Sequence, residues 1–191
     1  MRIDDKLNMV IPIQREGGHV VYVHVAPLSR ETFEANYLVM SKTFALIMAE
    51  GLTIVSGPRV AFLALKDVAK RMNIWEGPEG VERSLVNEMI RLSNVAAPGE
   101  NGWRTIPMHN AVTEGIFSED ELSEVLNAVT FFMLNSVMHK KDVLKPVLEG
   151  MCDLWGARIS SLALMEFVGS LQTLTAGASI GATGPTASVP S

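Results

Sequence analysis

The stretch that decides the fold runs from Ser118 to Met138 and reads SEDELSEVLNAVTFFMLNSVM. Ser118 precedes Glu121 by three residues, and this capping-box pattern, with acidic side chains at the positive end of the helix dipole, predicts a helix start. Apolar residues then recur at helical spacing, at Leu122, Val125, Leu126, Val129, Phe132 and Met133. Phe131 and Leu134 widen that face until the helix is apolar on nearly every side, which predicts a central helix or one that meets a partner.

Helical periodicity also covers most of the chain before this stretch. Ser29 is a typical N-cap and predicts a helix that Gly51 ends. Gly57-Pro58 and Gly77-Pro78 predict two further helix starts, because proline lacks the N–H that a first turn leaves unbonded anyway. The turn-forming residues at 94–99 predict the end of the third of these helices, and residues 96–102 predict an exposed loop, which is the expected internal hinge.

After the central stretch the sequence predicts two more helices and a tail. Asp142 is the expected cap of the first helix, with Pro146 in its first turn and Gly156 at its end. The second is expected from Ser160 or Ser161 to about Leu171 or Leu174. Residues 175–191, TAGASIGATGPTASVPS, lack charge, aromatic rings and periodicity, so we expect a flexible low-complexity tail.

The beginning of the chain has the pattern of β structure. Met9, Ile11 and Ile13 alternate with their neighbours, and a valine-rich run follows a turn with two glycines, so a β-hairpin is predicted at about residues 8–25. Pro12 places the first strand at a sheet edge or near its own end. The predicted fold is therefore mainly α (α+β): a single helical domain over residues 1–174 with an N-terminal β-hairpin.

Composition limits the classes of function. Of the 191 residues, 48% are hydrophobic and 19% charged, which predicts a folded core. The net charge of -5 leaves no basic stripe, so a nucleic-acid partner is not expected. The longest apolar run, residues 129–138, is shorter than the ~20 residues that span a bilayer, so no membrane is expected. The charged N-terminus does not fit a secretory signal and predicts a cytoplasmic protein.

Motifs of catalysis and of cofactor or metal binding are not visible in the sequence. It contains no Walker motif, no G-x-S-x-G and no H-E-x-x-H, and a single cysteine permits neither an internal disulfide nor a multi-cysteine zinc site. His19 and His24 are expected to be exposed residues on opposite faces of a strand. The acidic residues from Glu119 to Glu124 fit a solvated capping turn better than a carboxylate pair. We therefore predict a protein that is not an enzyme and has no catalytic, cofactor or metal residues.

Four residues near the end of the central helix are candidates for contact with a partner: Phe131, Phe132, Met133 and Met138. Methionine and phenylalanine side chains can form adaptable docking surfaces. The same residue types at helical spacing also fill cores, and packing inside the domain is the alternative role for each of the four.

The order of short strings along the chain is similar to that in a group of small proteins of long-tailed bacteriophages. The strings are MRIDDKLN at residues 1–8, GPRV at 57–60, FF at 131–132 followed by HK at 139–140, LWGA at 154–157, and the small-residue tail. On these strings the chain resembles the tail assembly chaperones, siphophage-like proteins encoded near the tape measure protein.

This resemblance implies a non-catalytic protein of the host cell cytoplasm that binds the tape measure protein and assists tail tube assembly. The tail tube protein and a second copy of the chain are further candidate partners. In such families a ribosomal frameshift near the end of the gene often yields a longer product, and the region after Leu174 is where such a junction could lie. Two other functions stay open: a structural tail component present in the virion, such as a tail completion or tube-associated subunit, and an enzyme with a nonstandard site.

Overall fold

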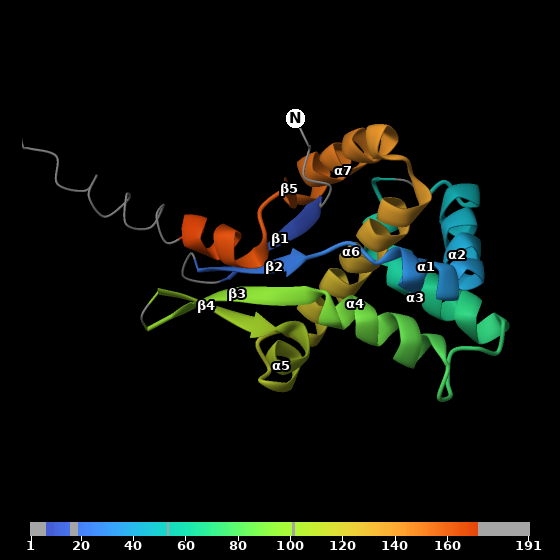
Figure 1. Ribbon diagram of the computed structural model, residues 1–191, viewed down its shortest axis with the longest axis horizontal. Coiled ribbons are helices and arrows are strands. Elements are labelled where there is room, and N and C mark those ends of the chain that lie inside the picture. Colours follow the sequence, from blue (N-terminus) through green and yellow to red (C-terminus); the bar gives the residue numbers. More distant parts are fainter. Residues whose placement is uncertain (1–6, 16–18, 53, 101, 172–191) are drawn as a thin grey trace, which may run out of the picture.

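The structure, a computed structural model, describes residues 7–15, 19–52, 54–100 and 102–171. In these residues the fold is α+β, as the sequence predicts, because helices pack against a five-stranded antiparallel sheet. Figure 1 shows the sheet towards one end of the molecule and most helices towards the other. The tail predicted for residues 175–191 lies outside the described part of the chain.

The sheet has the strand order β4-β3-β2-β1-β5. The strands are β1 (Asn8–Gln14), β2 (Val20–Val25), β3 (Ser93–Gly99), β4 (Gly102–Pro107) and β5 (Arg158–Ser160). The helices are α1 (Arg30–Ala35), α2 (Tyr37–Ala49), α3 (Gly57–Arg71), the π-helical turn η2 (Glu82–Val86), α4 (Asn87–Arg91), α5 (Met108–Thr113), α6 (Glu119–Met138) and α7 (Lys141–Trp155). A further helical segment covers residues 164–171.

The predicted N-terminal hairpin is confirmed by the antiparallel pairing of β1 and β2. Met9 lies opposite Val25, and Ile13 lies opposite Val21. Successive side chains of a strand alternate between the two faces of a sheet, so these apolar residues share one face. That face forms the main core together with the helices.

The exposed loop predicted at residues 96–102 is wrong, because Ala96 to Gly99 belong to β3 and Gly102 begins β4. β3 pairs with β2, where Val95 lies opposite Val23 and Ala96 opposite Tyr22. Val95 and Ala96 are fully buried. The local sequence has low strand propensity, and the burial that stabilises β3 comes from contacts with a strand about 70 residues earlier.

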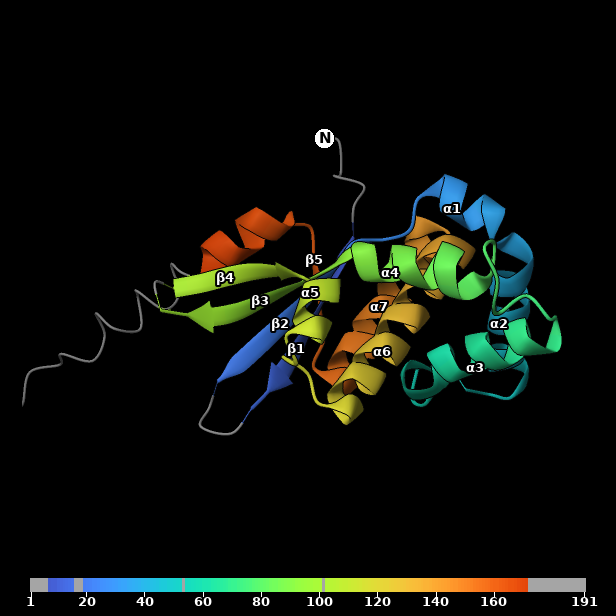
Figure 2. The same cartoon turned by 90° about the horizontal axis from the view of Figure 1, so that it is seen from below.

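Helix α6 is the central helix that the sequence predicts. The capping box is present, since the Ser118 side chain accepts from the Glu121 N–H and the Glu121 carboxylate accepts from the Ser118 N–H. In its second half, consecutive side chains from Phe131 to Leu134 are at most 1% exposed. Figure 2 shows α6 between the sheet and the group formed by α2 and α3, which explains why it is apolar on nearly every side.

Helices α3 and α6 are in close contact at the start of α3, where Gly57-Pro58 begins the helix as predicted. A Cβ atom on Gly57 would meet the ring of Phe131 and lie 2.7 Å from the carbonyl oxygen of Leu52. The buried Asn127 side chain accepts a 2.9 Å hydrogen bond from the Phe62 N–H. The two helices are therefore fixed by both packing and a buried polar contact.

Two predicted helix boundaries before the sheet's second hairpin are corrected. The helix capped by Ser29 is divided at Asn36 into α1 and α2, and the Asn36 side chain donates to the Thr32 carbonyl. Short polar side chains compete with helix hydrogen bonds in this way. The next helical run begins at Val81 rather than at Gly77-Pro78, because the N–H groups of Val81 and Glu82 donate to the carbonyls of the preceding loop, at Ile74 and Trp75.

Three boundaries near the C-terminus also differ. Lys140 rather than Asp142 is the N-cap of α7, since its carbonyl accepts the 2.8 Å hydrogen bond from Leu144 N–H. Pro146 therefore lies inside α7 and not in its first turn. Neither Ser160 nor Ser161 begins a helix, because Ser160 pairs with β1 as part of β5 and the helical segment begins at residue 164.

The sheet has a second, smaller apolar cluster on the face opposite the main core. The segment 164–171 lies there, on the side opposite α5 and α6 (Figure 2). The ring of Phe167 packs against Tyr22 and His24, with centroid distances of 5.6 and 5.8 Å. His24 is 4% exposed, so its predicted exposure is wrong, whereas His19 is exposed as predicted. Strand propensity alone does not show that a distant helix covers this face.

Candidate functional site

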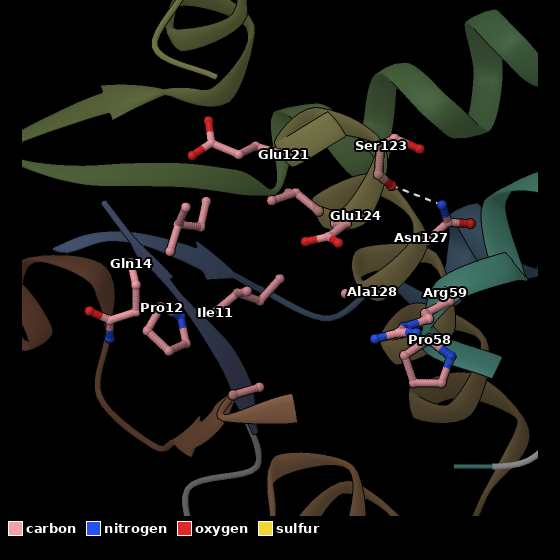
Figure 3. Close-up of a pocket in the computed structure, with 13 residues that line it drawn as sticks. Ile11, Pro12, Gln14, Pro58, Arg59, Glu121, Ser123, Glu124, Asn127 and Ala128 are labelled. Carbon is pink, nitrogen blue, oxygen red and sulfur yellow. Dashed lines mark hydrogen bonds between the residues drawn. The ribbon is translucent and has the colours of Figure 1, made fainter. Parts of the chain in front are cut away.

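A cavity of about 530 Å³ lies where the end of β1, the first half of α6 and the start of α3 meet (Figure 3). This volume is within the roughly 300–1,000 Å³ of ordinary ligand pockets. We call this cavity the β1 slot. Its lining residues are Ile11, Pro12, Ile13, Gln14, Pro58, Arg59, Glu121, Ser123, Glu124, Val125, Asn127, Ala128 and Ala157.

The β1 slot lies beside a part of β1 that has no neighbouring strand on that side. The short strand β5 pairs only with the residues from Asn8 to Val10. Before β5 the chain turns away at Gly156, which has a left-handed φ of +65° and ends α7. The residues from Ile11 to Gln14 are consequently paired with β2 on one side and face the β1 slot on the other.

The alternation of the hydrogen-bond ladder shows which backbone groups face the β1 slot. In antiparallel pairs every second residue exchanges hydrogen bonds with its partner strand. Arg15 N–H donates to the His19 carbonyl at 2.9 Å, so the odd-numbered residues of β1 bond to β2. Pro12 and Gln14 then direct their backbone groups to the open side. Pro12 is tolerated because its missing N–H faces that side, which agrees with the edge position predicted from the sequence.

The wall opposite β1 is apolar and held in place by a buried amide. Val125, Ala128 and Pro58 provide apolar surface. The Asn127 side chain donates to the Ser123 carbonyl at 2.8 Å, as drawn in Figure 3, and its oxygen accepts from α3. Because both ends of this amide are occupied, we assign Asn127 the role of fixing the wall.

Charged side chains lie at both ends of the β1 slot. Glu121 is committed to the capping box and to a 3.0 Å ion pair with Arg15. Glu124 is exposed and, among the residues that the structure describes, has no ion-pair partner. Figure 3 shows its carboxylate between Ile11 and Arg59, and Arg59 lies beside Pro58. This end of the β1 slot therefore carries both an acidic and a basic side chain.

The arrangement offers recognition chemistry: backbone groups of a short unpaired stretch of strand, an apolar wall, and Glu124 beside Arg59. Within residues 7–15, 19–52, 54–100 and 102–171, no group of three or more His, Cys, Asp or Glu side chains is placed to hold a metal ion. Open strand edges with adjacent side-chain pockets bind extended peptides.

The four residues singled out from the sequence do not line the β1 slot. Phe131, Phe132 and Met133 are at most 1% exposed in the main core, and Met138 is half-buried at the end of α6. The positions of the first three fit the packing role that was the alternative for each. Their burial leaves these three side chains no exposed surface for contact with a partner.

A second exposed feature is the outer face of α2, which the sequence reasoning did not single out. Leu38 is 55% exposed and Met48 38% exposed, and Ala45 is exposed between them. With the half-buried Ser41 they follow the three-and-four spacing of a coiled-coil seam. Lys42 is the one charged residue between Tyr37 and Ala49. The sequence pattern that indicates this face is the presence of apolar residues on both sides of the helix.

The comparisons with known proteins give no family. No protein-family model matches the chain, and neither a curated protein nor a solved structure shows significant similarity to it. In the part of the chain that the structure describes, none of the helices has the length and apolar character needed to cross a bilayer.

Proposed function

We propose that the chain is a non-catalytic tail assembly chaperone of a long-tailed bacteriophage, which acts in the host cytoplasm and binds the tape measure protein during tail assembly. The sequence strings that resemble this family support the proposal. The structural observation that carries it is the outer face of α2, where Leu38, Ala45 and Met48 are exposed apolar residues and Lys42 is the one charged residue.

This face suits a helical client. Leu38, Ala45 and Met48 lie along one side of the helix with Lys42 beside them, so the apolar stripe of another helix can pack along it. A surface helix normally has a polar outer face, and a helix that is apolar all round is normally covered. A long, helix-rich client with an apolar stripe of its own would cover the outer face of α2.

The test is co-expression of the full chain with the tape measure protein encoded in the same phage genome. A soluble complex of the two is expected, and Leu38→Glu or Met48→Glu should abolish it. The matched control is Val112→Glu on α5, because Val112 is also 38% exposed but lies away from α2. Loss of the complex with the control as well, or its survival in both α2 variants, would argue against this face.

The composition of purified virions separates the proposal from its main alternative. A chaperone is expected in infected cells and absent from mature particles. Detection of the chain at fixed stoichiometry in virions would instead identify a structural tail component.

A further inference from the structure

We infer that two copies of this chain join edge to edge through β4, in a symmetric antiparallel pair that continues the sheet from one copy into the other. β4 is the edge strand at the opposite side of the sheet from β5, and among the described strands its partner is β3. Figure 1 shows β4 at the sheet end of the molecule, away from α2. The inference therefore goes beyond the proposed function, whose client lies on α2, and it is tested separately.

The alternation of the ladder shows which backbone groups of β4 face outward. The odd-numbered residues of β1 bond to β2, so the registers leave the even-numbered residues of β2 for β3, and the odd-numbered residues of β3 for β4. Arg104 and Ile106 therefore bond to β3. The N–H and C=O groups of Trp103 and Thr105 face the open side, where no described residue forms a backbone hydrogen bond with them.

Two-fold symmetry and these outward groups select one register. In a pair centred on Arg104, Trp103 lies opposite Thr105 of the second copy, and every outward group of both residues has a hydrogen-bond partner. A pair centred on Thr105 sets Trp103 opposite Pro107, which has no N–H to donate. A pair centred on Trp103 sets Thr105 opposite residue 101, which precedes the first residue of β4.

The side chains on one face of β4 agree with this register. Trp103 packs against the small apolar cluster, and Thr105, two residues later, shares its face and is exposed. In the pair centred on Arg104, each Trp103 ring lies beside Thr105 of the second copy. Aromatic and β-branched residues that lie opposite each other stabilise antiparallel strands.

The charges on the other face are self-complementary. Arg104 is exposed next to Glu114 at the end of α5, and its Nη1 lies 3.9 Å from the Glu114 Oε2. An arginine on an edge strand normally opposes sheet extension. Here the two-fold axis brings two guanidinium groups together with two carboxylates, so the charge of Arg104 is compensated. Each feature of the edge has its complement on the same edge, as an isologous interface requires.

Sedimentation velocity of the full-length protein over a concentration series is the first test, and a reversible dimer is expected. Thr105→Pro removes an N–H that faces away from β3, so it should weaken the dimer at least about tenfold, equivalent to ~1.4 kcal/mol, without loss of a bond inside the sheet. Thr105→Val keeps this N–H and should keep the dimer, as should Met48→Glu on α2. A monomer at every concentration, or an unchanged dimer in Thr105→Pro, would overturn the inference.

Exchange of charges between copies tests the register with variants of exposed residues, whose ion pair contributes little to folding. Arg104→Glu collects four carboxylates at the axis and Glu114→Arg collects four guanidinium groups, so each variant alone should be monomeric. An equal mixture of the two variants should form a heterodimer, because opposite charges then meet across the axis. Absence of this heterodimer, or dimers of either variant alone, would contradict the pairing about Arg104.

Hydrogen exchange identifies what occupies the edge. The Thr105 amide should exchange readily in dilute full-length protein and slowly where the dimer forms, whereas the Arg104 amide, which bonds to β3, should be protected throughout. Protection of Thr105 at every concentration would show that the chain's own residues cover β4. A dimer in which the Thr105 amide still exchanges readily would show association through another surface. Either result would overturn the inference.

Discussion

At the residue scale, Gly57 shows how a single missing side chain sets the distance between two helices. Its position next to Phe131 and Leu52 leaves no room for a Cβ atom. Gly57→Ala should lower the free energy of unfolding by about 1–3 kcal/mol, because the backbone carbonyl of Leu52 cannot move as easily as a side chain. Urea denaturation measures this change.

A matched substitution separates crowding from a general effect of replacing glycine. Gly169→Ala adds the same atom to the segment 164–171, where nothing lies within 4 Å of it. This variant should keep or slightly increase stability, since alanine favours helix. Equal destabilisation by both variants would contradict the packing argument at Gly57.

His24 makes stability depend on pH. Burial lowers the pKa of His24 below its ordinary value of 6.5, and the hydrogen bond to the Leu162 carbonyl at 3.1 Å opposes this shift only in part. The unfolded chain therefore binds the proton more readily than the folded chain. The stabilisation by neutral His24 is complete above pH 6.5, declines as the pH falls through that value, and levels off below the folded pKa.

Denaturation at a series of pH values tests this dependence. His24→Gln retains an amide donor but cannot titrate in this range, so the decline of stability below pH 6.5 should become shallower. His19→Gln changes an exposed residue of the same hairpin and should leave the decline in place. An identical pH profile for wild type and His24→Gln would contradict the assignment.

At the element scale, α7 contains a residue that helices disfavour. Pro146 is exposed inside the helix, where it cannot donate to the carbonyl four residues earlier. Pro146→Ala should stabilise α7 by about 1–3 kcal/mol. Increased helicity and a higher Tm, followed by far-UV circular dichroism, are the expected results.

Pro78 provides the control of opposite sign. It is exposed in the turn after α3, where its fixed φ restricts the unfolded chain. Pro78→Ala should therefore have a neutral effect or lower stability by about 0.4–1 kcal/mol. A gain of stability in Pro78→Ala, or a loss in Pro146→Ala, would show that helix propensity does not control the result.

Local sequence patterns were sufficient to predict the elements that are specified by residues close together in the chain. The capping box at Ser118, the Gly57-Pro58 start and the alternation in β1 each correspond to an observed element. β3 could not be predicted in this way, because its small residues form a strand only beside β2. The burial of His24 likewise depends on a helix about 140 residues later in the chain.

The β1 slot was only partly visible from the sequence. Pro12 indicated an uncovered edge, and the structure agrees with that indication. The slot itself exists because β5 is three residues long and begins two residues after Gly156, which ends α7. The length of a pairing between distant segments is not contained in the periodicity of either segment, so the unpaired end of β1 could not be inferred beforehand.

At the scale of the whole molecule, the sheet separates two apolar clusters of unequal size. The main core lies between the sheet and α6, and the small cluster lies between the opposite face and the segment 164–171. Elements with few buried apolar contacts open at a lower free energy than the global core. We therefore expect the segment 164–171 to detach from the sheet before the molecule unfolds.

Two phenylalanine substitutions test this order of opening by native-state hydrogen exchange. Phe132→Ala removes a fully buried ring from the main core and should lower the global free energy of unfolding by about 3–5 kcal/mol. Phe167→Ala removes a half-buried ring from the small cluster, so it should speed exchange in residues 164–171 while the amides of α6 keep their protection. If Phe167→Ala lowered the protection of α6 and of the segment equally, the two clusters would unfold as one cooperative unit, because opening of the small cluster would then require loss of the main core.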